Sequence, residues 1–138
     1  MGLIGYHEML ERTRTIVNAV DLPVDVDIDT GYGNALNVYW TVLNFAKIGA
    51  ASVRLEDQVW PKRCGHMSGK EVIPEEEMIQ RIRAAIKAKD DTGIDMVIGA
   101  RTDARSIKGF EECLKRAINY AKAGANYVML RHLKKLVR

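Results

Sequence analysis

The alternation of strand-like and helix-like segments is the feature that most constrains the fold of this chain. Four apolar stretches with strand character lie at residues 24–29, 51–55, 96–100 and 125–130. Helical patterns separate these stretches, and another precedes the first of them. Strands that alternate with helices pair in parallel through right-handed crossovers, and chemistry in such folds gathers at the carboxyl ends of the strands. The sequence therefore predicts an α/β fold whose functional residues follow the strands.

The expected helices have clear boundaries. They cover residues 7–19, 34–48, a stretch that begins at residue 74, and residues 110–123. Gly49 and Gly124 stand where two of them should stop, which is a common role for glycine. Pro74 suits a first helical turn, and the three glutamates that follow it match the positive end of the helix dipole.

A partial internal repeat supports this register. Residues 46–55 and 121–130 share the pattern Ala-Lys-x-Gly-Ala-x-x-Val-x-Leu at an offset of 75 residues. Helix–glycine–strand joints favour these residue types, so the match aligns equivalent joints without proving duplication. The first copy runs into Glu56-Asp57 and the second into Arg131-His132. The fourth strand therefore delivers a cation where the second delivers acids.

Acidic residues follow the first two predicted strands. Asp27 and Asp29 lie two apart, so on a strand their side chains would share one face. Mg²⁺ usually takes one or two carboxylates and keeps several waters. A solvated edge strand with alternating acids explains this stretch equally well, but Glu56 at the end of the next strand favours a metal site. The Gly-Tyr-Gly turn at 31–33 permits unusual backbone angles near a ligand, although such turns are also common punctuation.

A reactive thiol is the second chemical feature. The segment reads Lys62-Arg63-Cys64-Gly65-His66. Neighbouring positive charge should lower the pKa of this thiol and hold it as a thiolate able to move protons. In the alternative interpretation, the lysine and the histidine are ordinary surface residues of a loop.

Arg101 ends the third predicted strand and should point toward the same rim as the acids. Its planar guanidinium can bind a carboxylate through two hydrogen bonds. Asp103 stands two residues further on and offers a simpler alternative, in which it pairs with Arg101 or caps the next turn.

Charge and composition exclude several classes of protein. The net charge of +3 is local, because residues 131–138 hold four of the 21 Lys and Arg residues and no acid. The rest of the chain lacks a basic stripe, so we expect no nucleic-acid partner. No apolar run approaches the roughly 20 residues of a membrane span, and no secretion signal is visible, so we expect a cytoplasmic protein without a membrane partner. The only other cysteine, Cys113, suits a buried spacer in a helix.

Four motifs in order resemble the isocitrate lyase and phosphoenolpyruvate mutase superfamily. They are Asp-Ile-Asp-Thr-Gly-Tyr-Gly-Asn at 27–34, Glu-Asp-Gln at 56–58, Lys-Arg-Cys-Gly-His at 62–66 and Ala-Arg-Thr-Asp-Ala at 100–104. The similarity runs from about residue 9 to residue 128. Cys64 in its setting resembles the lyase branch, because mutases carry a different loop there, and the short 2-methylisocitrate lyase type is the best match.

This resemblance implies a (β/α)₈ barrel that binds Mg²⁺ and a 2-oxo or 2-hydroxy carboxylic acid. Asp27, Asp29 and Glu56 would hold the metal directly or through water. The implied reaction is a retro-aldol cleavage of a 2-hydroxy tricarboxylate into succinate and a 2-oxo acid. Metal charge would stabilise the oxo product.

The resemblance also gives the thiol loop its roles. Cys64 would protonate the carbanion-like fragment after cleavage. Lys62 and His66 would tune that thiol. The substrate carboxylates would be bound by Arg101, Arg63 and Gly65.

The chain departs from the family pattern in length and at its end. A complete barrel needs about 250 residues, so residues 1–138 are expected to form one incomplete TIM-barrel domain of about four parallel strands. The basic tail at 131–138 stands where the family tends to present a glutamate. A half-barrel leaves open sheet edges, so we expect a homo-oligomer. Two alternatives stay open: a non-catalytic remnant or self-assembling half-barrel, and a mutase or oxaloacetate-cleaving relative, which Cys64 disfavours.

Overall fold

The computed structural model describes residues 3–64 and 67–131. Gly65, His66 and most of the basic tail therefore lie outside the described residues. The helices are α1 (Tyr6–Ala19), α2 (Ala35–Lys47), α3 (Glu75–Thr92), α4 (Arg105–Lys108) and α5 (Phe110–Lys122). The strands are β1 (Asp25–Asp27), β2 (Ser52–Glu56), β3 (Val97–Thr102) and β4 (Tyr127–Leu130). Each predicted strand and helix is present, and only the short α4 was not expected.

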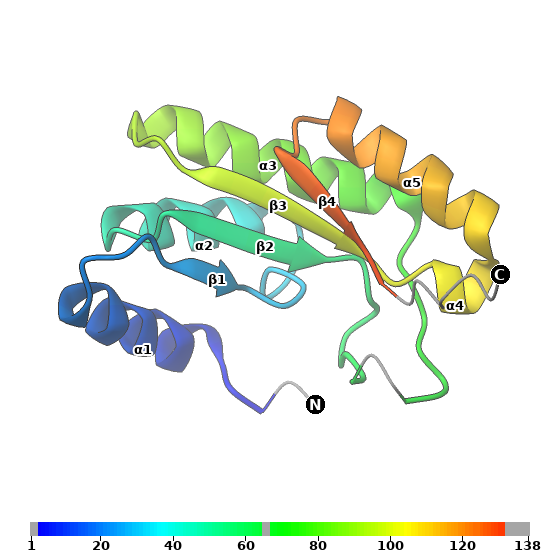
Figure 1. The fold of residues 1–138 in the computed structure, drawn as a ribbon, viewed down its shortest axis with the longest axis horizontal. Helices are drawn as coiled ribbons and strands as arrows, with labels where there is room; N and C mark the ends of the chain where they lie inside the picture. The colour runs from blue at the N-terminus through cyan, green and yellow to red at the C-terminus, as the bar shows by residue number, and fades with distance from the viewer. Residues whose placement is uncertain (1–2, 65–66, 132–138) are drawn as a thin grey trace, which may run out of the picture.

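The strands form one parallel sheet in the order β1-β2-β3-β4. Helices α2, α3 and α5 cover one face of this sheet, as Figure 1 shows. Neighbouring strands that follow one another in sequence, with every crossover helix on the same side, are the arrangement of consecutive units in a β/α barrel. The predicted partial barrel is confirmed. Within the described residues, no helix combines the length and apolarity that a membrane crossing requires.

The hydrophobic core lies between the sheet and its covering helices. Val53, Leu55 and Ile98 point into it and are fully buried. Successive strand residues face opposite sides, so their neighbours line the other face of the sheet. There Val97 is 42% exposed and Met129 is 41% exposed. The described residues thus cover one face of the sheet thoroughly and leave the other partly open.

The helix punctuation follows the prediction. Gly49 and Gly124 have positive φ angles of 90° and 115° at the ends of α2 and α5. In both joints the amide after the glycine donates back into the helix, to Phe45 O at 3.1 Å and to Tyr120 O at 3.2 Å. The matching hydrogen bonds show that the two similar sequence segments are equivalent helix-to-strand joints.

The first strand is shorter than the sequence suggested. It ends at Asp27, and Asp29 has a left-handed φ angle of 52°. The prediction that Asp27 and Asp29 alternate along one strand is therefore wrong. The turn that follows is tight, because a Cβ at Gly31 would lie 2.3 Å from a methyl carbon of Val38. Even so, Asp29 O accepts the Glu56 amide at 2.8 Å, which fixes the turn beside the end of β2.

Candidate active site

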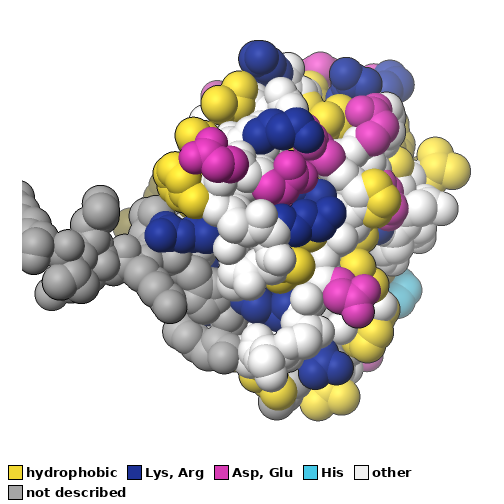
Figure 2. Space-filling model, turned by 90° about the vertical axis from the view of Figure 1, so that its right-hand side faces the viewer, with side chains coloured by type: hydrophobic (Ala, Val, Ile, Leu, Met, Phe, Trp, Pro, Cys, Tyr) yellow, Lys and Arg dark blue, Asp and Glu magenta, His cyan; other side chains and the backbone are white. Residues whose placement is uncertain are grey.

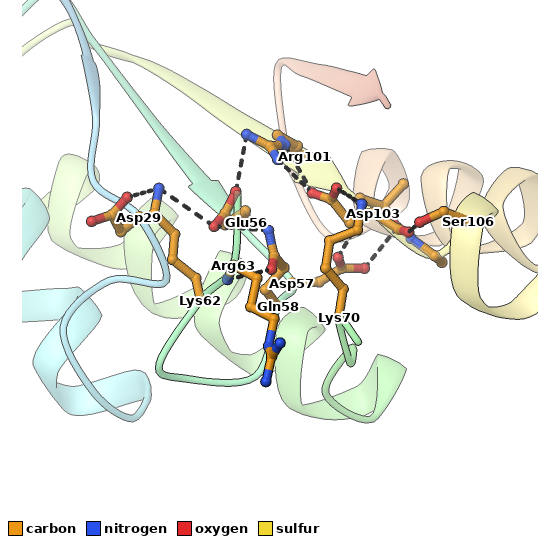
Figure 3. Close-up of polar contacts among 12 residues, drawn as sticks. Asp29, Glu56, Asp57, Gln58, Lys62, Arg63, Lys70, Arg101, Asp103 and Ser106 are labelled. Atoms are coloured by element: carbon orange, nitrogen blue, oxygen red, sulfur yellow. Dashed lines mark hydrogen bonds and ion pairs between the residues drawn. The ribbon is translucent and has the colours of Figure 1, made fainter. Parts of the chain in front are cut away.

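Lys62 joins two of the predicted site acids. Its ammonium group forms an ion pair with Asp29 and lies 3.6 Å from Glu56 Oε1. Asp29 follows β1, Glu56 ends β2, and Lys62 reaches back from the loop between β2 and α3 (Figure 3). The Glu56 side chain is only 1% exposed. A cation from the loop thus lies between two carboxylates at the carboxyl edge of the sheet.

Arg101 extends this cluster across the next strand. Its Nη1 lies 3.0 Å from Glu56 Oε2, and its Nη2 lies 2.7 Å from Asp103 Oδ2. Asp103 also pairs with the buried Lys70 at 3.1 Å. The simpler interpretation of Arg101, an ion pair with Asp103, is therefore present in the structure. Figure 2 shows basic and acidic side chains side by side on the face toward which the strands run.

Burial and charge act in opposite directions on the two groups at the centre. Burial raises the pKa of Glu56 above its usual range, although the charges of Arg101 and Lys62 partly offset this effect. For Lys62, burial lowers the pKa, but the hydrogen bond to Asp29 and the charge of Glu56 outweigh it and leave the pKa raised. The ammonium is therefore held in its charged form by the acids around it.

Asp27 has different partners. Its Oδ1 accepts the Asp29 amide at 2.9 Å, and its Oδ2 lies 3.6 Å from Arg54 Nη2. In residues 3–64 and 67–131, no three His, Cys, Asp or Glu side chains are gathered as a group that could hold a metal ion. The structure brings Asp29 and Glu56 together around Lys62 and leaves Asp27 beside Arg54. The assignment of all three acids as metal ligands stays a prediction.

The donor set nevertheless suits Mg²⁺. This ion is commonly bound by only one or two carboxylates and completes its shell with water and substrate. Asp29 and Glu56 supply two such groups, and a positive charge already lies between them. Glu56 Oε2 is buried and accepts no hydrogen bond, although Arg101 is nearby as an ion pair. A metal ion at this oxygen would replace an ion pair and would break no hydrogen bond, so the residues fit the ion.

The thiol loop is tied to the same cluster. Gln58 donates to Glu56 Oε1 at 3.3 Å and accepts the Arg63 amide at 3.1 Å. The Cys64 thiol is exposed, and its carbonyl accepts the Met67 amide at 2.9 Å. Gln58 therefore links the backbone of the thiol loop at Arg63 to the carboxylate of Glu56. The roles of Cys64, Lys62, Arg63, Gly65 and His66 stay predictions.

Comparison with known proteins identifies the family. The family model described as phosphoenolpyruvate phosphomutase matches residues 2–137. The chain belongs to this family. One similar protein is a 2,3-dimethylmalate lyase from Eubacterium barkeri. It is 46% identical to this chain over 130 residues, which cover 94% of this chain and 44% of that protein. A 2-methylisocitrate lyase from Aeropyrum pernix is 45% identical over 128 residues, which cover 93% and 40% of the two chains.

Solved structures of phosphoenolpyruvate phosphomutase family relatives agree with the fold. A crystal structure of 2,3-dimethylmalate lyase, described as a PEP mutase/isocitrate lyase superfamily member, has a TM-score of 0.91 and 37% identity over 94% of this chain and 44% of that one. A phosphonopyruvate hydrolase in complex with oxalate and Mg²⁺ has a TM-score of 0.84 and 32% identity, over 97% and 45% of the two chains. The chain thus spans less than half the length of these four relatives.

Some residues of this cluster were not predicted from the sequence. Lys70 belongs to none of the four motifs. It pairs with Asp103 only because the loop between β2 and α3 folds back to the end of β3. Arg54 lies inside a strand that reads as an ordinary apolar stretch, yet it pairs with Asp25 at 3.0 Å. The strand alternation could have indicated Arg54, since it shares a face with Glu56 two residues later. No local signal identifies Lys70.

Proposed function

We propose that this chain carries the metal and thiol half of a Mg²⁺-dependent carbon–carbon lyase. The substrate would be 2-methylisocitrate or a related 2-hydroxy acid with several carboxylates, such as 2,3-dimethylmalate. The observation that carries the proposal is the run of alternating charges at the carboxyl edge of the sheet. It consists of Asp29, Lys62, Glu56, Arg101 and Asp103.

Cleavage of such a substrate places charge at two positions. The 2-hydroxyl group gives its proton to a base such as a water molecule and becomes a carbonyl, the bond to the next carbon breaks, and the electron pair moves to that carbon. A positioned cation and a positioned acid lower the barrier at these two points. Mg²⁺ bound through Asp29 and Glu56, with Asp27 close by, would supply the Lewis-acid charge for the oxygen.

Residues of this chain would do the remaining work. Arg101 would exchange its bond to Asp103 for a substrate carboxylate and hold it with two hydrogen bonds. Cys64 would give its proton to the carbon that receives the electron pair, which yields succinate and pyruvate from 2-methylisocitrate. Lys62 and His66 would adjust the thiol, and Arg63 with Gly65 would help to hold the second carboxylate.

Turnover by the purified chain tests this proposal. The chain is incubated with Mg²⁺ and either 2-methylisocitrate or 2,3-dimethylmalate, and release of the 2-oxo acid is followed. We expect release that stops on chelation of the metal and that is lost in Cys64→Ser but kept in Cys113→Ser. Absence of release by the wild type rejects independent catalysis. Release that persists in Cys64→Ser rejects the role of the thiol.

A second candidate function is assembly. The sheet face that carries Val97 and Met129 is partly exposed, and the chain spans less than half of its relatives. A homo-oligomer that covers this face is therefore proposed alongside the catalytic role. Light scattering coupled to size exclusion measures the mass in solution. A stable monomer counts against assembly, and a stable oligomer that binds no Mg²⁺ favours a non-catalytic module.

A further inference from the structure

A buried polar network lies directly behind the candidate active site. Asp57 follows Glu56 in sequence and therefore points to the opposite face of the sheet, toward the helices. Its carboxylate is fully buried. Four donors reach it: Thr102 Oγ1 at 2.7 Å, Tyr120 OH at 2.9 Å, the Asp103 amide at 3.0 Å and Arg116 Nη1 at 3.2 Å.

These contacts give both oxygens of the carboxylate hydrogen-bond donors. An ionised carboxyl group offers about four acceptor positions, and Asp57 accepts four hydrogen bonds, three at Oδ2 and one at Oδ1. Buried charges are tolerated when they are paired and fully hydrogen-bonded, whereas the loss of one partner is costly. The network is therefore rigid, because any displacement of one member leaves a buried polar group without its partner.

The network joins elements that carry the candidate active site. Arg116 and Tyr120 belong to α5, Thr102 ends β3, and Asp103 directly follows that strand. The same Arg116 Nη1 donates to Ile73 O at 3.0 Å, at the far end of the loop that carries the thiol. The backbone adds to this connection, since the Asp57 amide donates to Arg101 O at 3.2 Å and Asp57 O accepts the Ile73 amide at 2.9 Å.

Asp103 is the link between the two faces of the sheet. Its backbone amide donates to Asp57 on the helix side, while its carboxylate accepts Arg101 Nε at 2.9 Å on the site side. A shift of Asp57 would therefore move the group that orients the Arg101 guanidinium. We propose that Asp57 is a positioning residue, which fixes the ends of β2 and β3 against α5 and so holds Glu56 and Arg101 in place.

This inference rests on the proposed function, which assigns Glu56 to the metal and Arg101 to a substrate carboxylate, but it can be tested separately. Tyr120→Phe and Thr102→Val each remove one hydroxyl donor to Asp57 and keep the side-chain shape. Tyr39→Phe is the matched control, since the Tyr39 hydroxyl also donates to an aspartate, Asp91 at 2.8 Å, but on the surface. Two measurements are made on each variant of the chain.

The first measurement is nuclear magnetic resonance of the Asp103 amide and the Arg101 Nε–H, with their hydrogen-exchange rates. We expect both signals to move in Tyr120→Phe and exchange to speed up about tenfold, since hydrogen bonds to charged groups are worth more than neutral ones. Tyr39→Phe should leave both signals unchanged. The second measurement is Mn²⁺ affinity, which we expect to weaken about threefold or more in Tyr120→Phe, because one such bond contributes to placing Glu56.

The outcomes separate cleanly. Unchanged Asp103 and Arg101 signals in both network variants, together with a lowered melting temperature, would show a purely stabilising network and overturn the proposal. If wild type binds no Mn²⁺, the proposed function fails, whereas the resonance data still decide whether Asp57 positions Arg101. If Tyr120→Phe does not fold, the smaller change in Thr102→Val supplies both measurements.

Discussion

The guanidinium group of Arg101 lies 3.0 Å from the carboxylate of Glu56, its register partner on the neighbouring strand. Both side chains are buried, so their charges interact in surroundings with little water. In the arrangement described, each group is satisfied by residues of the chain itself. Binding of a metal or a substrate carboxylate must therefore exchange these internal partners for external ones.

Removal of the loop cation should strengthen metal binding. In Lys62→Met the carboxylates of Asp29 and Glu56 lose the ammonium that lies between them. We expect Mg²⁺ affinity to rise about tenfold, since a unit charge about 4 Å from a divalent ion opposes it by about 2 kcal/mol even in water. Isothermal titration measures this. Lys87→Met removes an exposed ammonium with the same charge and should leave Mg²⁺ affinity unchanged. Equal or weaker Mg²⁺ binding by Lys62→Met would contradict the idea that the Lys62 ammonium opposes the metal.

Metal affinity should begin to fall at a higher pH than the protonation of an ordinary glutamate would cause. Burial raises the pKa of Glu56, so its carboxyl group takes up a proton at a higher pH than a solvated glutamate, whose pKa is 4.5. The protonated group cannot serve as a metal ligand. We expect Mg²⁺ affinity to fall as the pH drops toward this raised value, measured by titration at several pH values. A Glu56→Gln variant should bind weakly and without that step; an identical pH dependence in this variant would refute the assignment.

The same shift affects stability with the opposite sign. Because the folded pKa of Glu56 is raised, the folded chain holds the proton more tightly than the unfolded chain does. Its contribution to the free energy of unfolding is therefore present below pH 4.5 and is lost as the pH rises through the raised value.

Glu75 should show acid-dependent stability in the usual direction. Burial acts to raise its pKa, but hydrogen bonds from Lys115 and Asn119 of α5 leave it lowered. Its stabilisation is therefore present above pH 4.5 and is lost as the pH falls through the lowered value. We expect Glu75→Gln to lower the melting temperature near pH 7 and to match the wild type in strong acid. Glu76→Gln, on the exposed side of α3, is the control; a deficit that persists in acid would point to another cause.

The open face of the sheet depends on a glycine. A Cβ at Gly99 would lie 2.3 Å from the ring of Tyr127 on the neighbouring strand. We expect Gly99→Ala to destabilise the fold by about 1–3 kcal/mol through this overlap, measured by chemical denaturation. In a Tyr127→Ala background the same change should cost much less. Equal costs in the two backgrounds would mean that the ring does not pack on Gly99.

Much of the fold could be predicted because the signals are local. Gly49 and Gly124 end helices in this structure as their positions in the sequence suggested, and the buried residues of the strands carry the expected apolar pattern. The end of β1 could not be predicted in this way. Asp27 and Asp29 alternate as strand residues do, but the turn at Gly31 and the amide of Glu56 draw Asp29 into a left-handed conformation.

The candidate site was likewise predictable in part. The residues at the strand ends can be read from the amino-acid sequence alone. Their gathering at one edge, with Asp29, Glu56 and Arg101 among them, follows because parallel strands end on the same side of a sheet. The partners of these residues became known only from the folded structure. Lys62 bridges two acids, and Asp57 turns away to hold α5, since these contacts depend on how a loop and a distant helix return to the sheet. Spacing along the chain carries no information about such long-range returns.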